Sequence, residues 1–182
     1  MEADQPRLHP FELLLALDQR SRGRLAQSDE ADEGVVIAGR LALRLGTWHL
    51  MFAMGEIAEI IPMPKISRVP GVKAWLLGIA NLRGTVISIV DLNRFLGRAG
   101  SVITPSTRVV VVRQAEWSYG LLVDEIVGMR HFGYENRHVD LREAEDKLRP
   151  YLTDVLDAEG KLWMVFSLSR FLDDPRFMEA AE

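Results

Sequence analysis

Residues 75–97 read WLLGIANLRGTVISIVDLNRFLG, and residues 151–173 read YLTDVLDAEGKLWMVFSLSRFLD. In both stretches apolar residues alternate around a Gly-containing turn, a period of two that predicts a β-hairpin. Each hairpin leads into the motif Leu-x-Arg-Phe-Leu. With an offset of 76 the stretches share six identical positions: Leu76/Leu152, Gly84/Gly160, Leu92/Leu168, Arg94/Arg170, Phe95/Phe171 and Leu96/Leu172. We interpret this repeat as an internal duplication.

An offset of 69 aligns the residues that precede each hairpin. The aligned positions are Leu41/Val110, Leu43/Val112, Trp48/Trp117 and Glu56-Ile57/Glu125-Ile126. Both halves therefore have the order strand, turn, strand, short strand, loop, hairpin. We predict a mainly β fold of two similar five-stranded barrels, barrel one at about 35–97 and barrel two at about 105–175, with a groove between them.

Short alternating segments support the β assignment. The segments 40–45 and 48–54 alternate apolar and polar residues on either side of Gly46-Thr47, which predicts a first hairpin. Further strands are expected at 56–62, 80–83, 86–90, 108–113, 119–123, 126–131 and 162–167. Short strands separated by Gly, Pro and Asp/Asn turns favour barrels or a sandwich over a parallel sheet.

The N-terminal residues differ in character from the rest of the chain. Residues 10–26 start with Pro10 and carry Phe11 and leucines at near-helical spacing, which predicts a helix. That helix either docks on the remaining chain or binds a partner. Residues 27–34 are acidic and lack large apolar residues, as is typical of a linker. We therefore divide the chain into 1–34 and 35–182.

Composition excludes several classes of function. The 182 residues carry a formal net charge of −4 and include no cysteine, which rules out disulfides, thiolate metal sites and a cysteine nucleophile. No apolar run approaches the roughly 20 residues of a membrane span, and no signal peptide is evident. These absences predict a cytoplasmic protein that does not insert into membranes. Basic residues are scattered rather than clustered, so we expect no binding to nucleic acid.

Catalytic motifs are missing from the sequence. It has no nucleophile elbow, no phosphate-binding glycine loop and no dinucleotide fingerprint, so we expect no cofactor and no enzymatic activity. One alternative is a small metal-dependent enzyme that uses His131 and His138 with the nearby Glu135 and Asp140. Their spacing is not the compact spacing of known ligand sets.

Glu59 and Arg83 each lie among apolar neighbours in predicted strands. A charge in such a place is costly unless it is paired, so we expect the two side chains to meet across the sheet. Such a pair either fixes strand register or provides a polar spot within a docking surface.

The sequence Asn81-Leu82-Arg83-Gly84, followed by a hydrophobic strand and Asp91-Leu92 and preceded by Glu59-Ile60 and Gly78, resembles the CheW family of chemotaxis coupling proteins. The resemblance extends from about Arg40 to Leu172. The N-terminal Pro10-Phe11 and the segment 69–73 leading to Trp75 are most similar to a member from the chemosensory system that controls type IV pili and twitching motility.

This resemblance implies two SH3-like barrels and an adaptor at membrane-associated receptor arrays. The adaptor would couple the cytoplasmic tip of a methyl-accepting chemoreceptor to the regulatory domain of a CheA-type histidine kinase. Flagellar chemotaxis and competition for a kinase site are alternative roles. The partner-binding residues implied by motif position are Ile57, Glu59, Gly78, Asn81, Arg83, Gly84 and Ile126.

The sequence departs from the family pattern in two places. Ser88 replaces the usual proline in the strand after Asn-Leu-Arg-Gly, which affects the ladder of that strand. In the second copy Asp157 and Glu159 replace Asn81 and Arg83. This charge reversal predicts that the two barrels present different surfaces.

Overall fold

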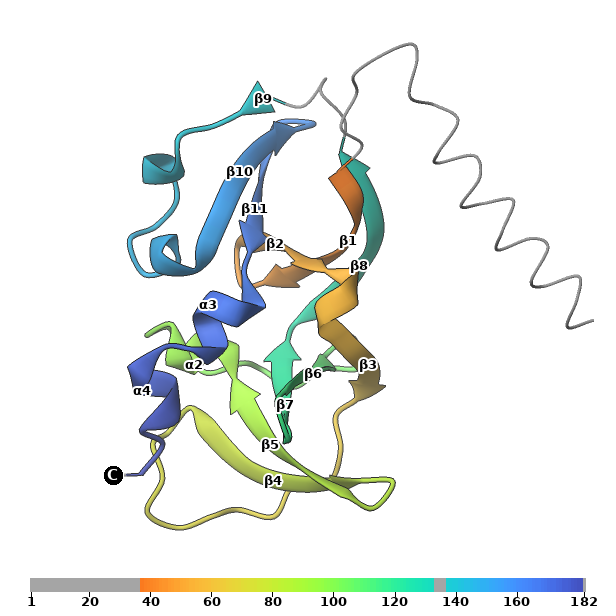
Figure 1. Ribbon diagram of the computed structural model, residues 1–182, viewed down its shortest axis with the longest axis vertical. Coiled ribbons are helices and arrows are strands. Elements are labelled where there is room, and N and C mark those ends of the chain that lie inside the picture. The colour runs from red at the N-terminus through yellow and green to blue at the C-terminus, as the bar shows by residue number, and fades with distance from the viewer. Residues whose placement is uncertain (1–36, 133–136, 182) are drawn as a thin grey trace, which may run out of the picture. The chain divides into compact units, whose positions relative to one another are not determined.

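The computed structural model describes residues 37–132 and 137–181 (Figure 1). The helix predicted at 10–26 and the linker at 27–34 lie outside these residues, so the division at residue 34 stays a prediction. The strands are β1 (Ile37–Leu45), β2 (Trp48–Ala53), β3 (Ile57–Pro62), β4 (Leu76–Leu82), β5 (Thr85–Asp91), β6 (Arg108–Gln114), β7 (Trp117–Val123), β8 (Glu125–Phe132), β9 (Arg137–His138), β10 (Leu152–Ala158) and β11 (Lys161–Phe166).

Short helices connect some of these strands. The 3-10 helices are η1 (Met54–Glu56), η2 (Leu141–Glu143) and η3 (Arg149–Tyr151), and the α-helices are α2 (Leu92–Phe95), α3 (Leu168–Leu172) and α4 (Pro175–Met178). The prediction of a mainly β chain is confirmed. No helix among the described residues combines the length and apolar character needed to cross a membrane.

The two hairpins of the repeat have the same local structure. β4 and β5 are joined by a turn in which Arg83 and Gly84 have φ of 50° and 88°, and β10 and β11 by a turn in which Glu159 and Gly160 have φ of 55° and 71°. Positive φ at both central residues matches the right-handed twist of the flanking strands. A side chain at the end of each hairpin then caps the following helix, since Asp91 accepts from the Arg94 amide and Ser167 from the Arg170 amide.

The strands form two sheets. Sheet I has the order β8-β1-β2-β11-β10-β9 and lies in the upper part of Figure 1, and sheet II has the order β3-β6-β7-β5-β4 and lies in the lower part. Each sheet therefore contains strands from both copies of the repeat. The prediction of one barrel at 35–97 and another at 105–175 is wrong, because β1 and β2 belong to one sheet whereas β3, β4 and β5 belong to the other.

The exchange has a simple structural origin. After β2, η1 carries the chain out of sheet I, and β3 pairs with β6 of the second copy instead of with its own hairpin. In the same way β8 pairs with β1 of the first copy. The β5–β7 and β11–β2 pairs are parallel. Each of them joins the second hairpin of one copy to the first hairpin of the other copy and so completes a sheet.

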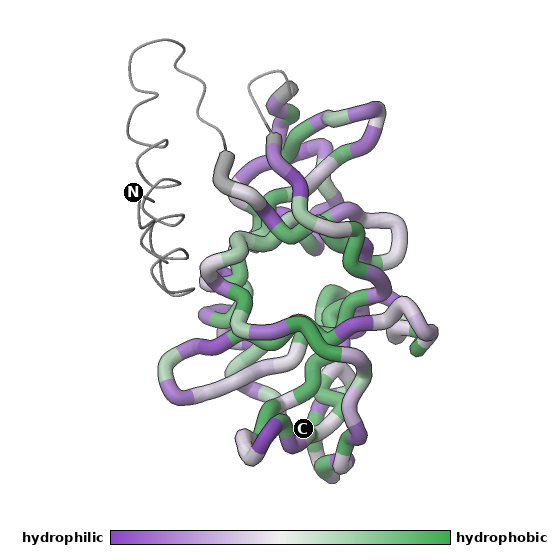
Figure 2. Tube along the Cα trace, turned by 90° about the vertical axis from the view of Figure 1, so that its right-hand side faces the viewer, coloured by the Kyte–Doolittle hydropathy of each residue, from purple (hydrophilic) through white to green (hydrophobic). Residues whose placement is uncertain are grey.

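A hydrophobic core lies between the two sheets. One large hydrophobic cluster combines Leu43, Leu50 and Phe52 from sheet I with Val110 and Leu121 from sheet II, all of them fully or almost fully buried. Figure 2 shows hydrophobic segments of both sheets gathered around the centre of the trace, where these side chains pack. Two smaller clusters lie on the opposite faces of the sheets.

Backbone contacts join the segment after β3 to β4, at the other edge of sheet II. Ser67 exchanges two backbone hydrogen bonds with Ile79, at 2.8 and 2.9 Å. Gly78, which has φ of 138°, makes this approach possible, because a Cβ there would lie 2.3 Å from the Ser67 carbonyl oxygen. In the second copy an equivalent contact joins the segment after β9 to β10, where the Val139 amide donates to the Val155 carbonyl at 2.9 Å.

The C-terminal helix α4 packs over the central cluster. Phe177 stacks on Trp75 with ring centroids 5.6 Å apart and contacts Tyr119 at 5.0 Å. The Tyr151 hydroxyl donates to Asp174 Oδ2 at 2.5 Å, and Arg176 contacts both residues. This polar cluster, in which only Tyr151 is fully buried, attaches α4 to the rest of the chain.

Replacing Gly78 by alanine should destabilise the fold by about 2–3 kcal/mol, because the new Cβ meets a backbone oxygen and the positive φ is unfavourable for alanine. Gly55→Ala is the matched control, since a Cβ at Gly55 meets nothing within 4 Å. Urea unfolding of both variants measures the difference. Equal stability of the two variants would contradict the role assigned to Gly78.

Docking of α4 should depend on pH. Hydrogen bonds from Arg176, the main cause, lower the pKa of Asp174 from 3.8 to about 2, so the stability it contributes is present at neutral pH and is lost as pH falls from about 4 towards 2. Burial, followed by the hydrogen bond to Asp174, raises the pKa of Tyr151 from 10.0 to about 12, so its contribution is lost as pH rises through that interval. In urea unfolding across pH, the free energy of unfolding should fall less steeply below pH 4 in Asp174→Asn than in the wild type. Above pH 10 it should fall less steeply in Tyr151→Phe. Unchanged slopes in both variants would refute this assignment.

Candidate functional site

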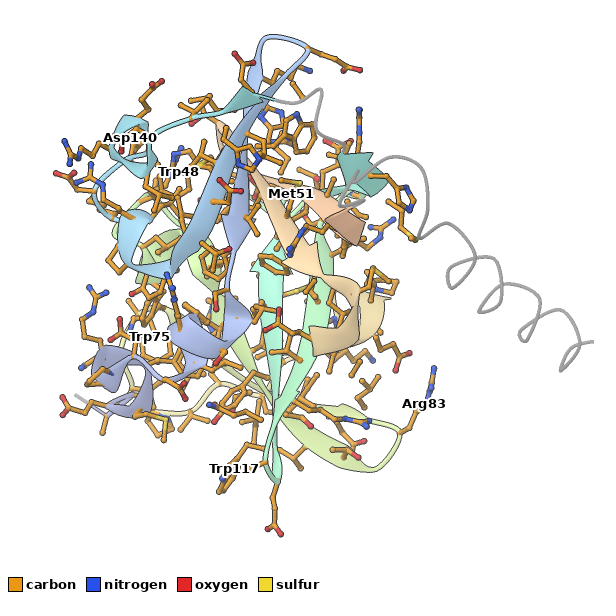
Figure 3. All side chains as sticks on the ribbon, turned by 45° about the horizontal axis from the view of Figure 1, so that its top comes forward. Trp48, Met51, Trp75, Arg83, Trp117 and Asp140 are labelled. Carbon is orange, nitrogen blue, oxygen red and sulfur yellow. The ribbon has the colours of Figure 1, made fainter. Side chains whose placement is uncertain are left out.

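Glu59 on β3 and Arg83 in the β4–β5 turn form an ion pair. Arg83 Nη2 donates to Glu59 Oε1 at 2.7 Å, which confirms the predicted contact. The expected burial is wrong for Arg83, whose side chain is 79% exposed, because this residue lies in the turn and not in a strand. Figure 3 shows Arg83 projecting from the end of the hairpin. Because β3 and β4 are the two edges of sheet II, the pair links one edge to the hairpin at the other.

Asn81 holds the turn that presents Arg83. Its Oδ1 accepts a hydrogen bond from the Gly84 amide at 2.8 Å. This side chain to backbone bond is a known way in which asparagine fixes a turn. Four of the implied partner-binding residues therefore meet at one end of sheet II, and we call Glu59, Asn81, Arg83 and Gly84 the hairpin tip.

A small hollow lies beside the ion pair. It has a volume of about 110 Å³ and is lined by Ala58, Glu59, Leu82, Arg83, Thr85, Ile87, Val111, Arg113 and Ser118. The hollow is too small for a cofactor, but its mixed polar and apolar lining next to an arginine suits one inserted side chain of another protein.

The other three implied residues lie elsewhere. Gly78 is on β4 and serves the contact with Ser67 described above. Ile57 on β3 and Ile126 on β8 are half-buried and pack against the central cluster from different sheets. The structure does not bring Ile126 to the hairpin tip.

The second copy has a reversed counterpart of the hairpin tip. Glu159 occupies the turn position of Arg83 and is 73% exposed, and its Oε2 lies 3.7 Å from Arg130 Nη1 on β8. The same kind of link thus joins β8 to the β10–β11 turn with the acid and base exchanged. The turns of the two sheets therefore present opposite charges.

Ser88 lies inside sheet II. It pairs with Ile79 on β4 and with Tyr119 on β7, so β5 has a hydrogen-bonded neighbour on each side. A serine can contribute its amide to this ladder, whereas a proline cannot.

A polar network that the sequence did not predict lies beside a hollow of about 530 Å³, lined in part by Arg44, Asn93, Arg98 and Asp124. Asp91 is only 2% exposed and accepts from the amide and hydroxyl of Ser101, and Asn93 Nδ2 donates to the same hydroxyl at 3.0 Å. The signal for it was Asp91, a charged residue directly after five mostly apolar ones. The network fixes the loop after α2.

The alternative hypothesis places a metal ion at His131 and His138. The described residues contain no group of three or more side chains able to hold a metal ion, and Glu135 lies outside them. His138 Nδ1 is 2.9 Å from Asp154 Oδ2 on β10.

The hairpin tip should contribute little to stability. Exposed ion pairs yield about 1 kcal/mol or less, so a double-mutant cycle of Glu59→Gln and Arg83→Gln should give a coupling free energy below about 1 kcal/mol in urea unfolding. Asn81→Ala, which removes the bond to the Gly84 amide, should cost about 1 kcal/mol. A coupling above about 2 kcal/mol would make the ion pair a structural element instead of a surface feature.

Comparisons with known proteins agree with this architecture. Residues 40–176 match the model of the CheW-like domain. Protein PilI of Pseudomonas aeruginosa is 35% identical over 172 residues, which covers 94% of this chain and 96% of that protein. Chemotaxis protein CheW of Thermotoga maritima is 25% identical over 134 residues, covering 74% of this chain and 87% of that protein.

A solved structure has the same fold. The scaffolding protein TtCheW from Thermoanaerobacter tengcongensis superposes with a TM-score of 0.64 at 16% identity, over 75% of this chain and 93% of that one. With the family model matched across residues 40–176 and the two-sheet fold shared with this structure, the chain belongs to the CheW-like domain family.

Proposed function

We propose that this protein is a non-catalytic adaptor that couples the cytoplasmic tip of a chemoreceptor to the regulatory domain of a CheA-type histidine kinase. Its place of action would be a receptor array at the cytoplasmic face of the membrane. Membership of the CheW-like family supports the proposal. So does the hairpin tip, which exposes an arginine whose ion pair should add little to stability.

The hairpin tip is the observation that carries the proposal. Asn81 fixes the turn, Glu59 orients the guanidinium, and a small hollow lies beside both. Arginine held in one orientation beside a small hollow is a common kind of anchor in protein interfaces. Because the turn is already ordered, little conformational entropy is lost when a partner binds.

We further propose that the adaptor serves a chemosensory system that controls type IV pili and twitching motility. The similarity to PilI covers 94% of the chain and so extends into the first 36 residues, beyond the sheets. The similarity to the Thermotoga CheW covers only 74% of the chain. A flagellar role is the alternative, and twitching assays after gene deletion would separate the two.

Coupling requires that receptor state change the relative affinities of the adaptor for its partners. The oppositely charged turns of sheets I and II would allow two partners to bind at different places. A central cluster shared by both sheets would connect these places through packed side chains.

Arg83→Ala should weaken binding to the kinase regulatory domain or to the receptor tip at least about tenfold, because it removes the charged anchor. Arg142→Ala is the matched control, since Arg142 is 86% exposed on η2, away from the hairpin tip. Calorimetric titration with each partner measures affinity, and a reconstituted kinase assay measures coupling. The proposal fails if the wild-type protein binds neither partner, or if Arg83→Ala behaves like the control.

A further inference from the structure

The repeat places three pairs of apolar residues at equivalent positions of the two sheets, and in each pair one member is much more buried than the other. Trp48 is 5% exposed and its counterpart Trp117 is 70% exposed. Val155 is fully buried while Ile79 is 37% exposed, and Leu162 is half-buried while Val86 is 61% exposed. The covered members belong to sheet I and the exposed members to sheet II.

Ile79, Val86 and Trp117 share one face of sheet II, which we call the bare face. Ile79 is opposite Ser88 and Asn81 is opposite Val86 on the β4–β5 ladder. Ser88 is also level with Tyr119, so Val86 and Trp117, two residues earlier on each strand, point the same way. Asn81 of the hairpin tip lies on this face, so the bare face and the hairpin tip are adjacent.

Sheet I shows what covers such a face. The Trp48 indole Nε1 donates to Glu145 Oε1 at 2.8 Å, and the Arg98 guanidinium lies 4.1 Å from the centre of the ring. Ala144 and Leu148 are buried in the same cluster as Trp48. Figure 3 shows Trp48 near the segment that carries Asp140, whereas Trp117 points away from the sheet. The cover is thus a short segment of helical turns with one carboxylate and two aliphatic side chains.

Loop length explains why only sheet I has this cover. The offset between the copies grows from 69 to 76 residues across the connection to the hairpin, so the second copy has seven additional residues there. Those residues make room for η2 and the turn that ends at Leu148. The shorter connection between β3 and β4 contacts β4 through Ser67 and leaves Trp117 uncovered.

We propose that the bare face binds a short helical segment of a partner protein, with a carboxylate that accepts the Trp117 indole N–H and a leucine-sized side chain that packs beside the ring. Tryptophan buries a large area and is enriched among residues that dominate binding energy. The chain itself contains the template of this interaction at Trp48. The inference goes beyond the proposed function, because it assigns a second surface with its own recognition chemistry.

A peptide with the sequence of residues 139–151, VDLREAEDKLRPY, is the direct probe. In the intact, ¹⁵N-labelled protein, the four tryptophans each give an indole N–H signal, and Trp117→Phe identifies the one from Trp117. Titration should shift the Trp117 signal saturably and leave that of Trp48 unchanged. Replacing the glutamate equivalent to Glu145 by glutamine should weaken binding about tenfold, because the acceptor of the indole bond loses its charge.

Variants of the protein test the position of the site. Val86→Ser should weaken peptide binding several-fold, and Trp117→Ala should abolish it. Val102→Ser is the control, since Val102 is 77% exposed on the loop after α2, outside the bare face. It should bind like the wild type.

Three results would overturn the proposal. One is the absence of a saturable shift at about 1 mM peptide. Another is equal binding of the glutamine peptide. The third is self-association in sedimentation that Trp117→Ala removes, which would assign the bare face to a second copy of the chain. The experiment contains neither kinase nor receptor, so its failure leaves the proposed function standing.

Discussion

The exchange of β3 and β8 between the two copies is the constraint on which the rest of the structure depends. Each of these strands leaves its own hairpin and pairs with the first hairpin of the other copy. Neither copy can then complete a sheet alone, so the backbone hydrogen bonds of each half are satisfied only when both halves are folded. The same exchange brings the two sheets together over one hydrophobic cluster.

The exchange also places the two charged turns on different sheets. Sheet II ends in a turn with an exposed arginine and sheet I in a turn with an exposed glutamate. In both sheets an ion pair links an edge strand to the hairpin turn: β3 to the β4–β5 turn, and β8 to the β10–β11 turn. Because the pairs are exposed, they orient side chains more than they stabilise the fold. Both turn side chains are thus largely exposed to solvent.

Much of the local structure could be predicted from the sequence. Alternation identified the hairpins, the repeat identified the equivalent elements, and the apolar surroundings of Glu59 and Arg83 identified their contact. The arrangement of the sheets could not be predicted, because a period of two shows which face of a strand is buried but not which edge pairs with which strand. The strand 152–158 was visible only through the repeat, since Asp154 and Asp157 interrupt its alternation.

The two equivalent tryptophans show the same limit most clearly. Trp48 and Trp117 both begin the second strand of a hairpin, so local pattern treats them alike. Their burial is decided by a connection nearly a hundred residues from Trp48, whose additional length covers one ring and not the other. A duplicated fold can in this way keep one copy of a surface for its own stability and leave the other for binding. In a protein that works by contact with other chains, divergence of loop length between the copies is enough to create a docking surface from a core position.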